Sequence, residues 1–317
     1  MRTFLSLVIV LLANQVLAQT EPHYTMFMYN KLLYNPAYAG SRDLTTINAD
    51  YRDQWTGING APKTCNVTID GTVGSYMMPF RKVALGLSLN SEQLGVEKNT
   101  DFVAYYAYRL QLGKSVLSFG LDAGAKLYAA NYSALNPYQQ NDPNLQHNIN
   151  NAFLPNFGSG VYWSSNKYYA GFSVPNILQN YYDKNERKIN NKASREIRGY
   201  YLSGGYVFSM GEHFKLEPQV MGRYAGNSDY QLPMNCDFNL SAIFYERLLI
   251  GGSYRTDKSF EAIIHMQVTK NINIGYAYDY MMSALNGYTN GSHELVVGYD
   301  IIRENIKIVT PRFIKAF

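Results

Sequence analysis

The histidines are the first side chains to test for catalytic or metal-binding chemistry. There are five of them, and none has a second histidine, a cysteine or a carboxylate at the spacing of a defined metal-ligand motif. The chain also lacks the G-x-S-x-G, H-E-x-x-H and P-loop motifs of nucleophilic, zinc and phosphate chemistry. His265 shares one face of a predicted strand with Glu261 and Gln267, but no partner serine can be identified for it. The sequence therefore predicts no enzyme activity, no metal and no cofactor.

Charged side chains recur at alternate positions of the predicted strands, on the face that also carries small and polar residues. They are Arg109, Asp122, Lys126, Glu217, Arg223, Arg255, Glu261, Asp279 and Glu294. Mixed signs on one face suggest ion pairs inside a closed barrel or a water-filled pore, and ion pairs are the favoured interpretation. Cys65 and Cys236 fall on the opposite, apolar face of separate strands, so we expect them to face lipid and to stay unpaired.

The elements that must position these residues are strands with a period of two. Between residues 117 and 127, large apolar residues alternate with small or polar ones over eleven positions, which is the length that a tilted strand needs to cross a membrane. Counted along the whole chain, this pattern predicts fourteen strands. Their approximate spans are 45–54, 63–71, 82–90, 100–111, 115–130, 157–164, 167–174, 198–209, 214–225, 235–246, 248–256, 259–269, 271–280 and 293–301.

The connections between these strands favour a transmembrane antiparallel β-barrel of about 14 strands, an all-β fold. Very short turns follow the predicted strands that end at 111, 164, 209, 246 and 269, whereas long polar loops fall on the other side, at 131–156 and 175–197 among others. This asymmetry is typical of outer-membrane barrels. A soluble β-sandwich or propeller also alternates, but it would expose charged residues, and these strands carry few. An even strand count would put both termini on the periplasmic side.

Composition and the start of the chain agree with a secreted, non-nucleic-acid-binding protein. Charged residues make up only 16% of the 317 residues, against about 25% in ordinary domains, and a net charge of +4 is too weak to argue for nucleic acid. Arg2, an apolar run and small residues at Val16 and Ala18 predict a signal peptide over 1–18. We expect residues 19–44 to form an N-terminal segment and 45–317 to form the barrel, with outer-membrane lipids around it.

The N-terminal segment is apolar and irregular. Residues 34–41 read YNPAYAGS, with Pro36 and Gly40 unfavourable in a helix or a strand. Loose exposure of Phe27, Leu33 and Tyr38 would create an apolar patch. We therefore expect the segment to pack inside the barrel as a plug or at its periplasmic rim, with contact to a partner protein as the sharper alternative.

Two motifs in this region resemble the PorP/SprF family. The first contains Asn35, Pro36, Ala37, Tyr38, Ala39, Gly40 and Ser41. The second is YRDQW, at residues 51–55, with Tyr51, Arg52, Gln54 and Trp55 as its signature positions. Thr25 and Met26 stand where the family usually has Ser-Gln, and Lys31 stands where it often has Pro. The segment HELVVGYD near the C-terminus is similar to the last strand of the family.

The resemblance implies a non-catalytic outer-membrane component of type IX protein secretion. Family members either belong to the core machinery, with periplasmic lipoprotein and ring components as partners, or help to secrete and attach large surface adhesins, including those of gliding motility. The motif residues are then candidate partner contacts, and the C-terminal domain of an adhesin is a candidate cargo. The loop tyrosines Tyr132, Tyr138, Tyr181 and Tyr182 are candidate external contacts. The alternative from the residues themselves is a passive porin or small-solute channel.

Overall fold

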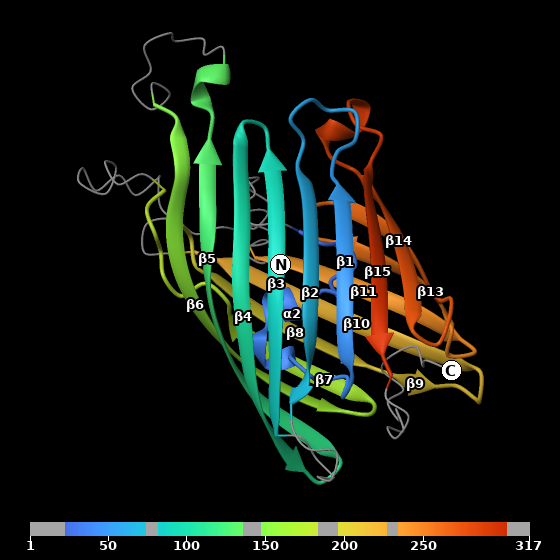
Figure 1. The fold of residues 1–317 in the computed structure, drawn as a ribbon. Coiled ribbons are helices and arrows are strands. Elements are labelled where there is room, and N and C mark those ends of the chain that lie inside the picture. The colour runs from blue at the N-terminus through green and yellow to red at the C-terminus, as the bar shows by residue number, and fades with distance from the viewer. Residues whose placement is uncertain (1–22, 74–81, 136–146, 183–195, 227–233, 303–317) are drawn as a thin grey trace, which may run out of the picture.

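The strands form one closed antiparallel barrel, seen in the computed structural model of the chain (Figure 1). The structure describes residues 23–73, 82–135, 147–182, 196–226 and 234–302; the predicted signal peptide lies outside them. Each strand pairs with its neighbours in the chain, and β1 pairs with β15 from Thr45 opposite Ile301 to Asp53 opposite His293. β8 and β9 both pair with β10 and are separated at Val207, so they occupy one position in the wall. The ring therefore has fourteen positions, as the sequence predicts.

The described strands and helices have the following bounds. The strands are β1 (Thr45–Asp53), β2 (Lys63–Val73), β3 (Val83–Leu94), β4 (Glu97–Leu112), β5 (Ser115–Ala130), β6 (Ile149–Ser165), β7 (Tyr168–Val174), β8 (Gly199–Tyr206), β9 (Phe208–Ser209), β10 (Phe214–Ala225), β11 (Asn235–Phe244), β12 (Leu248–Arg255), β13 (Ser259–Gln267), β14 (Ile272–Met281) and β15 (Ser292–Ile301). The helical turns are α2 (Lys31–Tyr34), η1 (Pro36–Tyr38), η2 (Tyr132–Ala134) and η5 (Ala284–Gly287). None of the helices in the described part of the chain has the length and apolarity needed to cross a bilayer.

The wall is polar inside and apolar outside. In β13, Phe260, Ile264 and Met266 are about half exposed, whereas Glu261 and His265 on the other face are buried. A soluble fold would bury the first set and expose the second. The inversion is that of a barrel surrounded by lipid. Cys65 and Cys236 are both free, as expected.

β3, β4 and β6 extend furthest beyond the bounds that the alternation predicts. β3 and β4 run to Leu94 and from Glu97, so only Gly95 and Val96 connect them, with Gly95 at φ 58°. β6 begins at Ile149, eight residues before the expected start at 157. Its first residues carry turn-forming Asn and Pro, and they are held as a strand by pairing with β5, through a register shift between Tyr128 and Ala130. The expected loop 131–156 is therefore shorter by the part that belongs to β6.

The barrel has two distinct ends. At the short-turn end, turns of two to four residues connect β4 to β5, β6 to β7, β9 to β10, β11 to β12 and β13 to β14, and β1 begins next to the end of β15. The long-loop end carries the connections 131–148 and 175–198. Residues 23–44, here called the lumen segment, precede β1 and lie inside the ring, where Figure 1 shows α2 surrounded by strands.

Candidate functional site

The lumen segment is buried along almost its whole length. Its apolar side chains form the two main clusters of the barrel interior, one around Met26, Phe27 and Tyr34 and the other around Leu32 and Tyr38. Short turns give the segment its shape: Tyr29 N–H donates to Met26 C=O (3.0 Å) and Asn35 N–H donates to Lys31 C=O (2.9 Å). The segment therefore replaces the water that would otherwise fill the lumen with packed side chains.

The first turn of the segment is held by a carboxylate from the wall. The two carboxylate oxygens of Glu294 on β15 accept the backbone N–H groups of Thr25 (2.7 Å) and Met26 (2.9 Å). Arg52 on β1 pairs with Glu294 at 3.0 Å and with Asp279 on β14 at 2.6 Å. Charge-assisted bonds of this kind are among the strongest hydrogen bonds in proteins. Arg52 thus fixes both carboxylates, and Glu294 fixes the backbone of the segment.

This ion pair belongs to a longer charged belt on the wall from β10 to β1. Arg255 on β12 pairs with Asp237 and Glu261, and Arg223 on β10 pairs with Asp237 at 2.7 Å. Arg255 also lies 3.9 Å from Asp279 and so joins the belt to the Arg52 cluster. Internal ion pairs are therefore present, as expected, and the connected belt lies in this half of the wall. Arg109 on β4 and Lys126 on β5 form separate pairs with Asp43 and Glu196.

The NPAY part of the segment docks on the opposite half of the wall, where glycines leave room for it. A methyl group added at Gly120 of β5 would lie 2.0 Å from the Ala37 nitrogen, and one added at Gly160 of β6 would lie 2.2 Å from Asn35 Oδ1. Any larger residue at either position would therefore collide with the segment. Asn35 itself accepts from Ala37 N–H (2.9 Å) and donates to Val161 C=O (3.1 Å), so it begins η1 and binds it to β6.

The end of the segment turns into β1 through two further contacts. Gly40 has φ 67°, a left-handed conformation that favours glycine, and its N–H donates to Asp70 Oδ2 of β2 at 2.7 Å. A methyl group there would also lie 2.5 Å from Ala84 Cβ. Arg42 then forms a two-pronged pair with Asp300 of β15, with both distances 2.8 Å. The φ angle and the close contact with Ala84 explain why glycine stands at position 40 of the motif.

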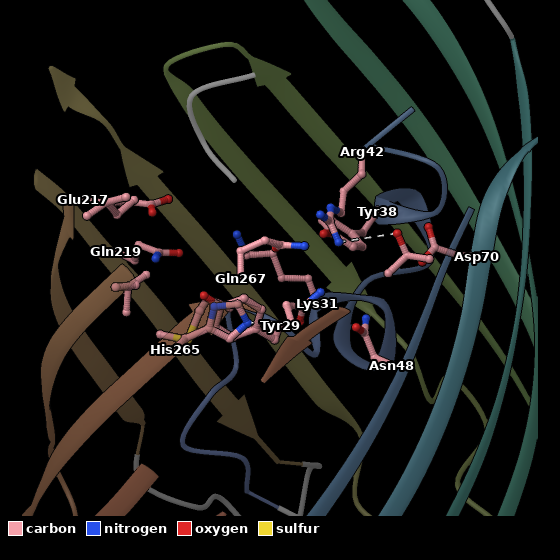
Figure 2. A pocket seen from close by; sticks show the side chains of 15 residues that line it. Tyr29, Lys31, Tyr38, Arg42, Asn48, Asp70, Glu217, Gln219, His265 and Gln267 are labelled. Atoms are coloured by element: carbon pink, nitrogen blue, oxygen red, sulfur yellow. Dashed lines mark hydrogen bonds between the residues drawn. The ribbon is translucent and has the colours of Figure 1, made fainter. Parts of the chain in front are cut away.

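His265, the one histidine with possible catalytic neighbours in the sequence, lines a pocket on the short-turn side of the segment (Figure 2). Its ring stacks on Tyr29, with centroids 4.0 Å apart, and its Nε2 bonds Asn273 Oδ1 at 3.1 Å. An amide and a phenol ring do not activate a histidine as a base. Among the described residues, no group of three His, Cys, Asp or Glu side chains could hold a metal ion.

Burial keeps the tyrosines of the segment neutral. Burial raises the pKa of the Tyr34 hydroxyl well above its usual range, and this oxygen accepts the Tyr24 N–H at 3.3 Å. Tyr24 donates its own hydroxyl to Asn90 Oδ1 of β3 at 3.0 Å. Neutral hydroxyls in these positions act as fixed donors and acceptors, so the tyrosines serve to hold the segment.

The structure places the sequence-predicted motif residues in three environments. All seven from Asn35 to Ser41 are buried in the lumen, and so are Arg52 and Gln54. Tyr51 is 47% exposed on the outer face. Trp55 is half-buried just after β1, with φ 52° and its N–H bonded to Ser292 Oγ. A partner could reach the buried positions only if the segment left the lumen.

Of the loop tyrosines, Tyr182 packs on Tyr128 with ring centroids 4.6 Å apart, and Tyr132 bonds the Tyr128 hydroxyl at 3.2 Å. Tyr138 lies outside the described residues. The sequence identified Asp279 and Glu294 as inward-facing, but not their role in binding the segment. The glycine-lined wall was also missed, although glycines at inward positions of neighbouring strands are a usable signal for close backbone approach.

A known family and solved structures are similar to this chain over most of the barrel. A family model described as type IX secretion system membrane protein PorP/SprF matches residues 16–299. No curated protein matches significantly. Among solved structures, a Pseudomonas aeruginosa FadL homologue is similar at 10% identity and a TM-score of 0.44, over 85% of this chain and 93% of that one.

Two further solved barrels are similar at the same level of identity. The NanC porin has 10% identity and a TM-score of 0.42, over 82% of this chain and 100% of that one. Outer membrane phospholipase A from Escherichia coli has 10% identity and a TM-score of 0.36, over 82% and 92%. The family match covers most of the chain, including both motifs and all strands of the wall except the last two residues of β15. The chain therefore belongs to the PorP/SprF family of type IX secretion system membrane proteins, and it is an integral β-barrel protein of the outer membrane.

Proposed function

We propose that the protein is a non-catalytic binding component of type IX secretion, whose barrel is closed by its own N-terminal segment. It either works in the core machinery with periplasmic lipoprotein or ring components, or helps to secrete and anchor a large surface adhesin of the gliding type. In both cases the loops, the rims and the lumen segment bind the partners, because a closed barrel has no free sheet edge for a partner to pair with.

The observation that carries this proposal is that the lumen segment contacts opposite walls. Its first turn is bound by Glu294 of β15, and Ala37 lies against Gly120 of β5. A passive porin needs a continuous water-filled path, and a segment that crosses the lumen obstructs one. The porin alternative therefore has no specific support beyond the polar inner wall.

The proposed orientation puts the short-turn end in the periplasm. Outer-membrane barrels place short turns on the periplasmic side and long loops outside. β1 begins and β15 ends at the short-turn end, whereas the first turn of the segment lies against Glu294 and Arg52 near the opposite ends of these two strands. Periplasmic partners would then meet the short turns and any released part of the segment, and an adhesin domain would meet the loops at 131–148 and 175–198.

Affinity purification from gently solubilised outer membranes tests the proposal. The bait is the full chain with a C-terminal tag, compared with a variant that lacks 23–41 and with Gly204→Ala as a matched variant, because a methyl group at Gly204 has no contact closer than 3.5 Å. We expect the full chain and Gly204→Ala to retain secretion components, and the deletion to lose those that need the segment.

The partners recovered decide between the two branches. Periplasmic ring or lipoprotein components support the core machinery, and a large secreted protein supports the adhesin branch. Recovery of the folded barrel with neither would overturn the proposal, whereas unchanged partners on deletion would overturn only the role given to the segment.

A further inference from the structure

A second pocket lies on the long-loop side of the lumen segment. Its volume is about 130 Å³, well below the roughly 300–1,000 Å³ of small-molecule sites. Tyr24, Leu33 and Tyr34 of the segment contribute one side of it, and the inward faces of β3, β4 and β5 contribute much of the rest. The size suits a single side chain and excludes an oligosaccharide or a lipid.

The charges around this pocket favour a cation. Glu92, Asp101 and Asp122 line it, and Lys126 is the one basic residue among the described residues of its lining. The Lys126 ammonium is already bound to Glu196 at 2.9 Å. The excess of carboxylates among these described residues therefore favours a negative potential in the pocket, which repels anions and attracts an ammonium or guanidinium group.

Asp122 is the group that a cation would satisfy. It is 6% exposed, and within the described residues its Oδ2 has no hydrogen-bond partner. The carboxylate fits against β6 because residue 158 is glycine; a methyl group there would lie 2.3 Å from Asp122 Oδ2. A buried carboxylate oxygen without a partner is costly to a fold. Its retention beside a pocket of this size points to a ligand that supplies the missing charge.

Aromatic rings complete the site. Tyr24, Tyr34, Tyr105, Tyr182 and Tyr201 line the pocket. Tyrosine faces attract cations, and Arg more often than Lys is bound in this way. We propose that this pocket binds a lysine or arginine side chain of a polypeptide that reaches the long-loop end of the barrel. That this polypeptide is secreted cargo rests on the proposed function, whereas the chemistry of the pocket does not.

Titration of the purified full-length protein in a neutral detergent tests the inference directly. The probes are the amides of Nα-acetyl-arginine and Nα-acetyl-lysine, with the neutral citrulline and norleucine amides as matched compounds, and binding is followed by saturation-transfer NMR. We expect the cationic probes to bind at least about tenfold more tightly than the neutral ones. Asp122→Asn should lower their association constant at least about tenfold, and Asp53→Asn, which pairs with Lys63 away from the pocket, should leave it unchanged.

Each possible result of this titration either supports or overturns the inference. Equal binding of arginine and citrulline amides, or undiminished binding to Asp122→Asn, overturns the inference. Should Asp122→Asn fail to fold, as judged by its heat-dependent migration in SDS gels, the comparison of charged and neutral probes on the unmodified protein decides alone. Absence of probe binding while secretion components still co-purify overturns the pocket and leaves the proposed function standing. Probe binding without any co-purified secretion component supports the pocket and overturns the proposed function.

Discussion

Two halves of the barrel wall hold the same segment by different physical means. From β10 to β1, the wall holds the first turn by charge: Arg52 fixes Glu294, and Glu294 accepts the N–H groups of Thr25 and Met26. From β5 to β6, the wall holds η1 by shape, with Gly120 and Gly160 leaving room for the backbone of the segment. The charged half contains the belt of ion pairs, and the glycine half contains no comparable belt among its described residues.

The difference teaches which changes each half tolerates. A buried ion pair adds little over a well-packed apolar pair, but removal of one partner leaves a buried charge and is strongly destabilising. A glycine contact has no charge to lose and is broken only by adding atoms. The charged half should therefore be sensitive to deletion of side chains, and the glycine half to their enlargement.

The largest effect is expected from Arg52→Met. This change leaves Glu294 and Asp279 buried without their cation, which costs about 3–5 kcal/mol. The measurement is the rate of tryptic cleavage after Lys31, a bond that trypsin reaches only when the buried segment leaves the lumen. We expect the rate to rise about 100-fold or more, with the fragment identified by mass spectrometry.

Arg109→Met is the matched control for Arg52→Met. Arg109 is equally buried, but Asp43, with which it forms an ion pair, is 61% exposed, so water can solvate the Asp43 carboxylate when Arg109 is replaced. Loss of an ion pair with a solvent-exposed carboxylate lowers the free energy of unfolding by only about 0–1 kcal/mol. Equal acceleration of cleavage in the two variants would contradict the assignment of Arg52 as the anchor of the charged half.

A smaller effect is expected from Gly120→Ala. The added methyl group would overlap the Ala37 nitrogen, and overpacking of this kind costs about 1–3 kcal/mol. The cleavage rate at Lys31 should rise about 5-fold to 100-fold. Gly204→Ala adds the same methyl group where its nearest contact is 3.5 Å, so its rate should match that of the unmodified protein. Identical rates for the two glycine variants would remove the steric explanation of the glycine half.

The smallest effect is expected from Asn35→Ala. This variant loses the bond to Ala37 N–H and the bond to Val161 C=O but creates no collision and no buried charge. Loss of a helix-capping side chain costs about 0.5–2 kcal/mol, so cleavage should accelerate about 2-fold to 30-fold. Asn131→Ala, at an exposed position on the long-loop end, serves as the control. If Asn35→Ala accelerated cleavage more than Arg52→Met does, the charged half would not hold the segment more strongly than the glycine half, contrary to the proposal.

The wall was largely predictable from the sequence, and the docking of the segment was only partly so. Alternation assigns Glu294 and Asp279 to the inner face because a period of two follows from strand geometry. The alternation does not predict that Arg52 contacts both carboxylates, because this contact depends on the register of β1 on β15 and on the neighbouring strand β14. The apolar character of the segment predicts that it is buried, but the collision of Gly120 with Ala37 depends on three-dimensional packing. β6 exceeds its predicted length because pairing with β5 outweighs the turn residues at its start.

The most direct test of the closed barrel is its conductance in planar bilayers. The full chain is compared with the variant that lacks 23–41, after heat-dependent migration in SDS gels has shown that both are folded. We expect no steady conductance from the full chain and a stable, ohmic conductance from the deletion variant, because removal of the segment leaves a polar lumen. A steady, ion-selective conductance of the same size from both proteins would contradict the claim that residues 23–44 close the barrel.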